Sequence, residues 1–145
     1  MFHYEADPKR SIVAFMSQLD EITERTENAA ADAVEAAGDV ITEKQRTMCP
    51  VRTGKLKSKI RRGKAYKNKS GHYTVRCGFD FRQDPDVRGA AVCFEFGRDG
   101  GTDKLGRAIM PIQSQPFIRP GADAAADEAA RRMEEVFFRE VGLND

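Results

Sequence analysis

The sequence predicts an α+β domain: a long N-terminal helix, a short turn, a three-stranded antiparallel sheet, and a C-terminal helix packed on that sheet. Apolar residues recur every three or four positions over residues 11–48 and again over 116–142, as amphipathic helices require. Between them, short runs rich in β-branched and aromatic residues are separated by stretches rich in glycine, asparagine and proline. With 145 residues, 40% of them hydrophobic, the chain has the size and composition of one folded domain.

The N-terminal helix is predicted over residues 11–48, after a loose start at 1–10. An unbroken helix of that length would extend about 55 Å at 1.5 Å per residue, so a break in the polar stretch 23–28 stays open. The face opposite the apolar stripe is acidic. The stripe itself comprises Ile12, Phe15, Met16, Leu19, Ile22, Thr26, Ala29, Ala33, Ala37, Val40, Ile41 and Met48.

A change of structure is expected in residues 48–60. Pro50 disfavours helical angles at the residue before it, so the first helix should stop there. Thr53 can cap a following turn through its hydroxyl group. Leu56 and Ile60 then predict one or two helical turns with a single apolar face.

The middle of the chain predicts the sheet. Residues 59–66 and 73–79 flank a loop rich in asparagine, serine and glycine, which predicts a hairpin. Residues 90–96 are more continuously apolar and should form a third, more buried strand. A mobile surface loop, rich in glycine, is expected to follow. The expected segments of this single domain (1–145) are 1–10, 11–48, 49–97, 98–115 and 116–142.

The residues offer no constellation for catalysis or metal binding. Cys49, Cys77 and Cys93 lack C-x-x-C spacing, and the two histidines are far apart. Catalysis needs at least two groups in defined roles, and Glu95, between two phenylalanines, has no evident second group. We therefore expect no enzyme, no metal and no cofactor, and keep a small hydrolase built on Glu95 as a lesser alternative.

Charge is divided along the chain although the net charge is only +1. A basic stretch, residues 52–69, directly follows the acidic helix and contains no acid. It could bind the phosphates of nucleic acid, make head-to-tail contact with the acidic helix of an identical subunit, or simply face solvent. The candidates for an interface or a DNA-facing surface are Arg52, Lys55, Lys57, Lys59, Arg61, Arg62 and Lys64.

The expected location is cytoplasmic. The N-terminus lacks the charged-then-apolar order of a signal peptide. No run approaches the ~18 apolar residues that span a membrane.

Three motifs together point to a known family. Cys49-Pro-Val-Arg-Thr-Gly-Lys-Leu-Lys-Ser-Lys-Ile60 resembles the signature (A)PV-x-TG-x-L-x-x-S-I. Phe94-Glu-Phe-Gly97 resembles Y-x-E-x-G-T, and Gln115-Pro-Phe-Ile-Arg-Pro120 resembles x-P-F-L-R-P-A. These signatures, in this order, are typical of a family of tailed-bacteriophage neck and tail-completion proteins, often labelled minor tail component or head–tail joining protein.

The resemblance implies a structural virion protein that joins head and tail as a ring, a hexamer or dodecamer, without cofactor or membrane. Its partners would be further copies, the neighbouring head-connector and tail proteins, and passing DNA. It would reside in the virion after assembly in the host cytoplasm. Neck or tail-terminator position, and phage or prophage origin, stay open.

The resemblance also implies scaffold and contact roles for the motif residues. Thr53 and Gly54 would shape the turn, Phe94 and Phe117 would pack it, and Glu95 would pair with Arg119. The full set is Pro50, Thr53, Gly54, Leu56, Phe94, Glu95, Gly97, Pro116, Phe117, Arg119 and Pro120.

Overall fold

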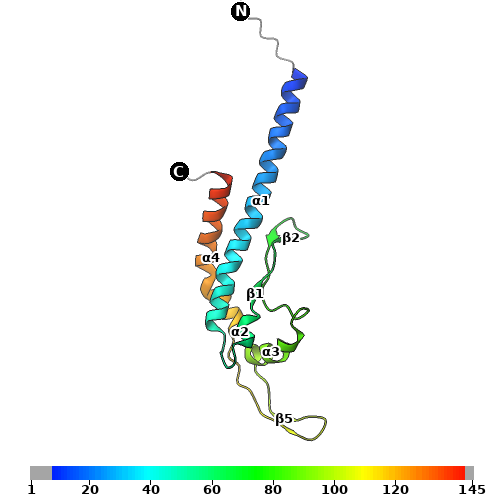
Figure 1. Cartoon of the computed structure of the whole chain (residues 1–145), viewed down its shortest axis with the longest axis vertical. Coiled ribbons are helices and arrows are strands. Elements are labelled where there is room, and N and C mark those ends of the chain that lie inside the picture. The colour runs from blue at the N-terminus through cyan, green and yellow to red at the C-terminus, as the bar shows by residue number, and fades with distance from the viewer. Residues whose placement is uncertain (1–7, 143–145) are drawn as a thin grey trace, which may run out of the picture.

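The computed structural model describes residues 8–142, with side chains from residue 12 onward. The expected loose start at 1–10 therefore lies mostly outside the described residues. Two long helices lie side by side, and the shorter elements gather beside the C-terminal half of the first (Figure 1). In chain order the elements are α1 (Pro8–Met48), α2 (Lys55–Ser58), β1 (Arg61–Arg62), β2 (Tyr66–Lys67), β3 (Tyr73–Thr74), β4 (Cys77–Gly78), η1 (Pro85–Val87), α3 (Arg88–Phe96), β5 (Gly101–Thr102), β6 (Ala108–Ile109) and α4 (Ile118–Val141).

Helix α1 is continuous, so the chain does not break in the polar stretch 23–28. Two threonines in that stretch bond within the helix: the Thr23 hydroxyl donates to the Leu19 carbonyl at 2.9 Å, and the Thr26 hydroxyl donates to the Ile22 carbonyl at 2.8 Å. These bonds satisfy both hydroxyl groups without interrupting the backbone ladder. The helix ends two residues before Pro50, as predicted.

Helix α4 packs on α1, so the prediction that it covers a sheet is wrong. The two helices run antiparallel: Gln45 Nε2 donates to the Ile118 carbonyl at 3.0 Å, and Arg25 Nε donates to the Glu140 carbonyl at 3.1 Å. Two stripes of small residues let the backbones approach closely, whereas the small sheets offer no face wide enough to cover a helix. The buried small residues are Ala29 and Ala33 on α1, and Gly121, Ala125 and Ala129 on α4.

The expected third strand at 90–96 is helix α3, which is a correction to the predicted three-stranded sheet. The apolar residues that face the core are Val87, Ala91 and Phe94, and their spacing of four and three is helical. Phe96, which a strand would place on the same face as Phe94, is 77% exposed. Gly97, with φ of 78°, ends the helix in a conformation that L side chains rarely adopt.

The sheets are small two-stranded pairs. The predicted hairpin at 59–79 exists as two antiparallel ladders, β1–β4 and β2–β3, joined by the Gly63 N–H bond to the Arg76 carbonyl at 2.8 Å. A further hairpin, β5–β6, lies where we expected no packed element, and an Arg98–Ile112 bridge closes its base. The core beneath these elements consists of Cys49, Leu56, Ile60, Val87, Ala91 and Phe117.

Candidate interaction surface

The first motif forms a tight turn between α1 and the hairpin. Gly54 precedes α2 in the left-handed region, with φ of 74°. The Thr53 hydroxyl accepts the Lys55 N–H at 3.4 Å, so Thr53 supports the turn although Gly54 occupies the cap position. Leu56 and Ile60 are buried, as the single apolar face predicts.

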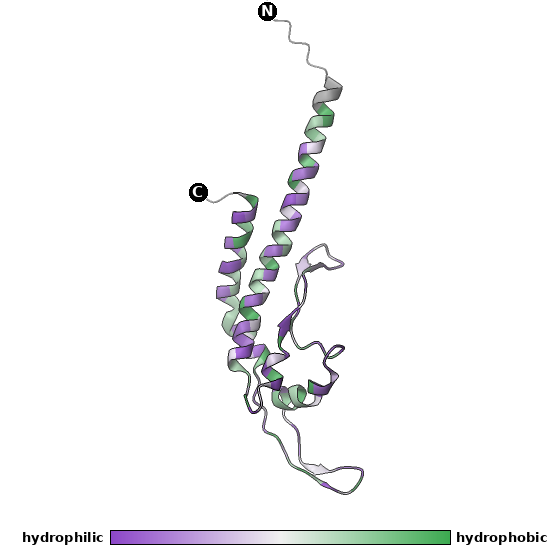
Figure 2. Ribbon diagram, in the orientation of Figure 1, coloured by the Kyte–Doolittle hydropathy of each residue, from purple (hydrophilic) through white to green (hydrophobic). Residues whose placement is uncertain are grey.

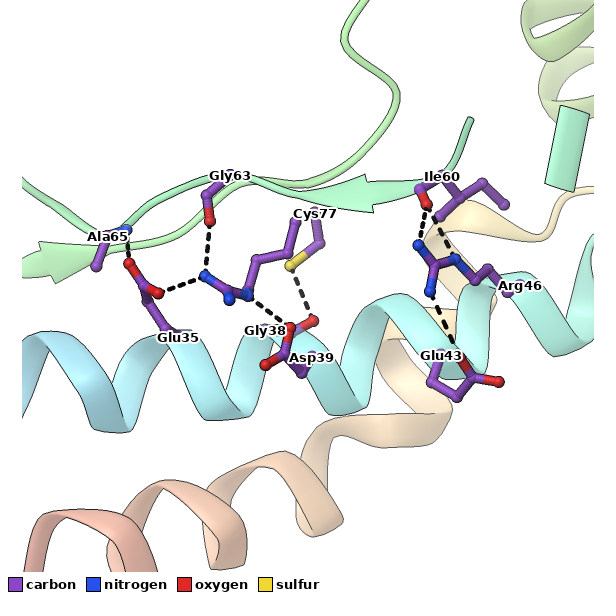
Figure 3. Close-up of polar contacts among 10 residues, drawn as sticks. Glu35, Gly38, Asp39, Glu43, Arg46, Ile60, Gly63, Ala65 and Cys77 are labelled. Carbon is purple, nitrogen blue, oxygen red and sulfur yellow. Dashed lines mark hydrogen bonds and ion pairs between the residues drawn. The ribbon is translucent and has the colours of Figure 1, made fainter. Parts of the chain in front are cut away.

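Helix α1 holds the end of this turn through a guanidinium group. Arg46 donates twice to the Ile60 carbonyl, from Nε at 3.0 Å and from Nη2 at 2.7 Å (Figure 3). The same guanidinium lies 3.6 Å from Glu43, one turn earlier on the helix. The turn therefore sits at a fixed place on α1.

Glu95 anchors the start of α4. Its carboxylate accepts the backbone N–H groups of Phe117, Ile118 and Arg119 at 2.9, 3.1 and 3.1 Å, where the first turn of a helix leaves donors free. Burial alone would raise the pKa of Glu95, but these three donors hold it below its ordinary value. The expected pairing with Arg119 exists through the backbone of Arg119, not through its guanidinium.

Other residues of the two late motifs lie around this anchor. Phe117 is fully buried and packs edge-on against Phe79 at 6.0 Å between ring centroids. Pro120 lies in the first turn of α4, and Pro116 is exposed just before the helix. Phe94 is partly buried against the same core.

Arg62 joins the basic segment to the acidic face of α1. It donates to Glu35 at 2.6 Å and to Asp39 at 2.5 Å (Figure 3). The bond to Asp39 is the main cause that raises the pKa of Arg62. The Ala65 N–H donates to Glu35 at 2.8 Å and, with Arg62, lowers the pKa of that carboxyl group. Arg62 is therefore a structural cation.

Three of the other six predicted basic residues are also paired within the chain. Asp84, only 6% exposed, binds both Lys59, at 2.7 Å, and Arg61. Lys55 pairs with Asp86 at 2.7 Å. A buried carboxylate needs such cations because an unpaired buried charge is very costly. Among the described residues, the predicted basic candidates that form no ion pair are Arg52, Lys57 and Lys64.

Sequence reasoning missed these acidic partners. The Asp84-Pro85-Asp86 stretch is typical of a turn, and nothing local shows that its carboxylates lie beside distant lysine and arginine side chains. The division into an acidic helix and a basic segment was visible, but part of that complementarity is satisfied within one chain through Glu35, Asp39 and Arg62.

An open pocket of about 370 Å³ lies between the first motif and α3. Pro50, Gly54 and Leu56 form one wall, and Ala90 and Phe94 form the other. The lining is mainly apolar, and its polar rim includes Arg52, Lys55 and Arg98. The motif residues thus build both the core and a surface hollow.

Within residues 12–142, no cluster of three or more histidine, cysteine or acidic side chains could hold a metal ion. Burial raises the pKa of the Cys49 and Cys77 thiols, so they resemble small apolar residues. No helix in the described part of the chain is long and apolar enough to cross a membrane.

Comparison with known families adds to this geometry. Residues 14–78 match the family model described as "Bacteriophage HK97-gp10, putative tail-component". The matched region contains most of α1, the first motif and the basic hairpin. No curated protein and no solved structure gives a match. Through residues 14–78, which hold the first of the three motifs, the chain is similar to the HK97-gp10-like family of bacteriophage tail components.

Proposed function

We propose that this protein is a neck or tail-completion component of a tailed phage or prophage, and that copies of it assemble as a ring where head and tail join. The match of residues 14–78 to a tail-component family carries the proposal. The two later motifs, which resemble those of head–tail joining proteins, add support. They meet where the Glu95 carboxylate, at the end of α3, accepts backbone N–H groups at the start of α4. Its partners are further copies and the neighbouring connector and tail proteins, in a virion assembled in the host cytoplasm.

The fold suits an architectural role. The described residues form two long packed helices, with the small elements held to them by ion pairs and hydrogen bonds. Glu95, the carboxylate we considered for hydrolysis, is fully engaged by backbone donors. We therefore propose that the protein acts by binding and not by catalysis.

A nucleic-acid-binding module is the second candidate, favoured by the cations of the stretch 52–69 that form no ion pair among the described residues: Arg52, Lys57, Lys64 and Lys69. Because Lys55, Lys59, Arg61 and Arg62 already bind acids of the same chain, few cations remain for phosphate. Each phosphate contact adds about 0.9 to the slope of log K against log salt on duplex DNA. A slope of about four or less is expected for these four cations, whereas a much steeper one would favour this candidate.

The decisive experiment is electron microscopy of lysates from particles that lack the gene. We expect separate filled heads and finished tails, with joined particles restored by a plasmid copy. Tails of abnormal length, or no tails, would move the protein into tail assembly itself. Joined and infectious particles without the gene would refute the proposal.

A further inference from the structure

The N-terminal part of α1 extends beyond everything that covers the rest of that helix. Helix α4 ends beside Arg25, where Arg25 Nε donates to the Glu140 carbonyl at 3.1 Å. The basic hairpin ends at a similar level, where Lys67 pairs with Glu27. Residues 12–24, here called the arm, continue past both partners (Figure 1).

The arm carries a large uncovered apolar stripe (Figure 2). Its positions recur at steps of three and four, in phase with Ala29 and Ala33, which α4 buries. The face of α1 that packs on α4 at Ala29 and Ala33 is therefore exposed to solvent along the arm. The large side chains of the stripe are Ile12 (62% exposed), Phe15 (58%), Met16 (54%), Leu19 (41%) and Ile22 (60%).

The arm is acidic on its other side. Lower on α1, Glu27, Glu35 and Asp39 are matched by Lys67 and Arg62. On the arm, Asp20, Glu21 and Glu24 are exposed and have no cationic partner among the described residues. A surface that covers the arm should therefore be both apolar and basic.

The opposite end of the molecule has such a surface. The pocket between the first motif and α3 is mainly apolar, and Arg52, without an ion pair among the described residues, lies on its rim together with Arg98. Val51, which lies in the chain between the lining residues Pro50 and Arg52, is 65% exposed. Small residues, Gly54, Gly89 and Ala90, leave the pocket open to a large side chain.

One chain cannot make this contact with itself. Phe15 and Pro50 are separated by an unbroken helix that ends at Met48, and at 1.5 Å per residue this places them about 50 Å apart. The occupant must be another molecule, and a second copy supplies an arm that matches the pocket in both apolar character and charge.

We propose that the arm of one copy docks in the motif pocket of the next, with its stripe against the apolar walls and its acids against the basic rim. The inference rests on the proposed ring assembly and names its subunit contact. Because the two contacting surfaces differ, the contact is heterologous: it repeats from copy to copy and closes into a ring if the rotation between copies allows. Within this contact Arg52 binds protein rather than DNA.

Two variants each remove one half of the contact. The arm variant carries Phe15→Glu and Leu19→Glu, and the pocket variant carries Ala90→Glu; all three positions are exposed in the described chain, so folding should persist. Ser17→Glu, on the arm but off the stripe, and Ala124→Glu, exposed on α4, are matched controls. Circular dichroism verifies the fold of each protein.

Sedimentation velocity and native mass spectrometry then measure association. We expect wild type and both controls to self-associate, and each test variant to associate at least about tenfold more weakly, since it loses burial of large apolar side chains or places a charge among them. An equimolar mixture of the two variants should form a one-to-one dimer that grows no further, because one intact arm meets one intact pocket.

Three results would overturn the contact. The wild type could stay monomeric at its highest soluble concentration. The pocket variant could associate as the wild type does, which indicates contact between arms. The two variants, both folded, could fail to form a dimer. None of these results alters the gene-deletion phenotype, which tests the proposed function separately.

Discussion

The carboxylate of Glu95 accepts the backbone N–H of Phe117 at 2.9 Å and so joins the end of α3 to the start of α4. This bond, with the two that follow it along the chain, fixes the position of the fully buried Phe117 ring. Two of the three sequence motifs meet at this single contact.

Replacing Glu95 by glutamine should destabilise the fold. The amide keeps the shape of the side chain but removes the charge that three backbone donors share, and hydrogen bonds to charged groups contribute about 1.5–3 kcal/mol. We expect a loss of about 1–3 kcal/mol in the free energy of unfolding, measured with urea. Glu128→Gln, at an exposed position of α4, is the control and should change it by less than about 0.5 kcal/mol. Equal effects of the two substitutions would contradict the anchoring role.

The free energy of unfolding should fall as the pH is lowered, because protonation removes the Glu95 charge that the three backbone donors bind. The pKa of Glu95 is lowered in the folded protein, so the charged carboxylate favours folding at pH values above its unfolded-state pKa. This contribution is lost as the pH falls through the lower, folded-state pKa. Urea titrations from neutral pH to about pH 3 should show a steeper loss in the wild type than in Glu95→Gln. Parallel curves for the two proteins would contradict this assignment.

Gly121 should tolerate no side chain. A Cβ atom there would lie 2.9 Å from both Cα and Cγ of Gln45, and Cα belongs to the backbone of α1. Gly121→Ala must push the two long helices apart and should cost about 1–3 kcal/mol, as overpacking does. Gly89→Ala is the matched control: its Cβ meets nothing within 4 Å, and alanine favours the helix there. Thermal unfolding should show a lower melting temperature for Gly121→Ala and an equal or higher one for Gly89→Ala.

Arg62→Met should release the hairpin from α1. The substitution keeps most of the stem but leaves Glu35 and Asp39 without the guanidinium that they bind at 2.6 and 2.5 Å. We expect a loss of about 1–2 kcal/mol and faster amide exchange in β1 and β4. Lys64→Met, at an exposed residue two positions away, should change stability by less than about 0.5 kcal/mol. Exchange that is unchanged in the hairpin would contradict the role of Arg62.

The long helices could be predicted because their signals are local and sustained. The stripe from Ile12 to Ile41 holds helical phase over many turns, and Pro50 and Gly142 mark where helices end. The turn containing Leu56 and the hairpin at 59–79 likewise follow from local residue types.

The strand assigned to 90–96 was wrong because a short apolar run fits either period. Tertiary contacts decide the matter: Ala91 and Phe94 face the core one helical turn apart, while Phe96 faces solvent. The packing of α4 on α1 and the pairing of Asp84 with Lys59 depend on residues far apart in sequence. Local sequence patterns therefore could not predict these two contacts.

An add-back experiment with lysates that lack the gene tests directly whether this protein joins heads to tails. Purified wild-type protein should join the separate heads and tails, with infectious particles counted by plaque assay and seen by electron microscopy. The arm variant with Phe15→Glu and Leu19→Glu should restore far fewer, and Ser17→Glu should restore as many as the wild type. If heads and tails join equally well without added protein, the protein is not a head–tail joining component.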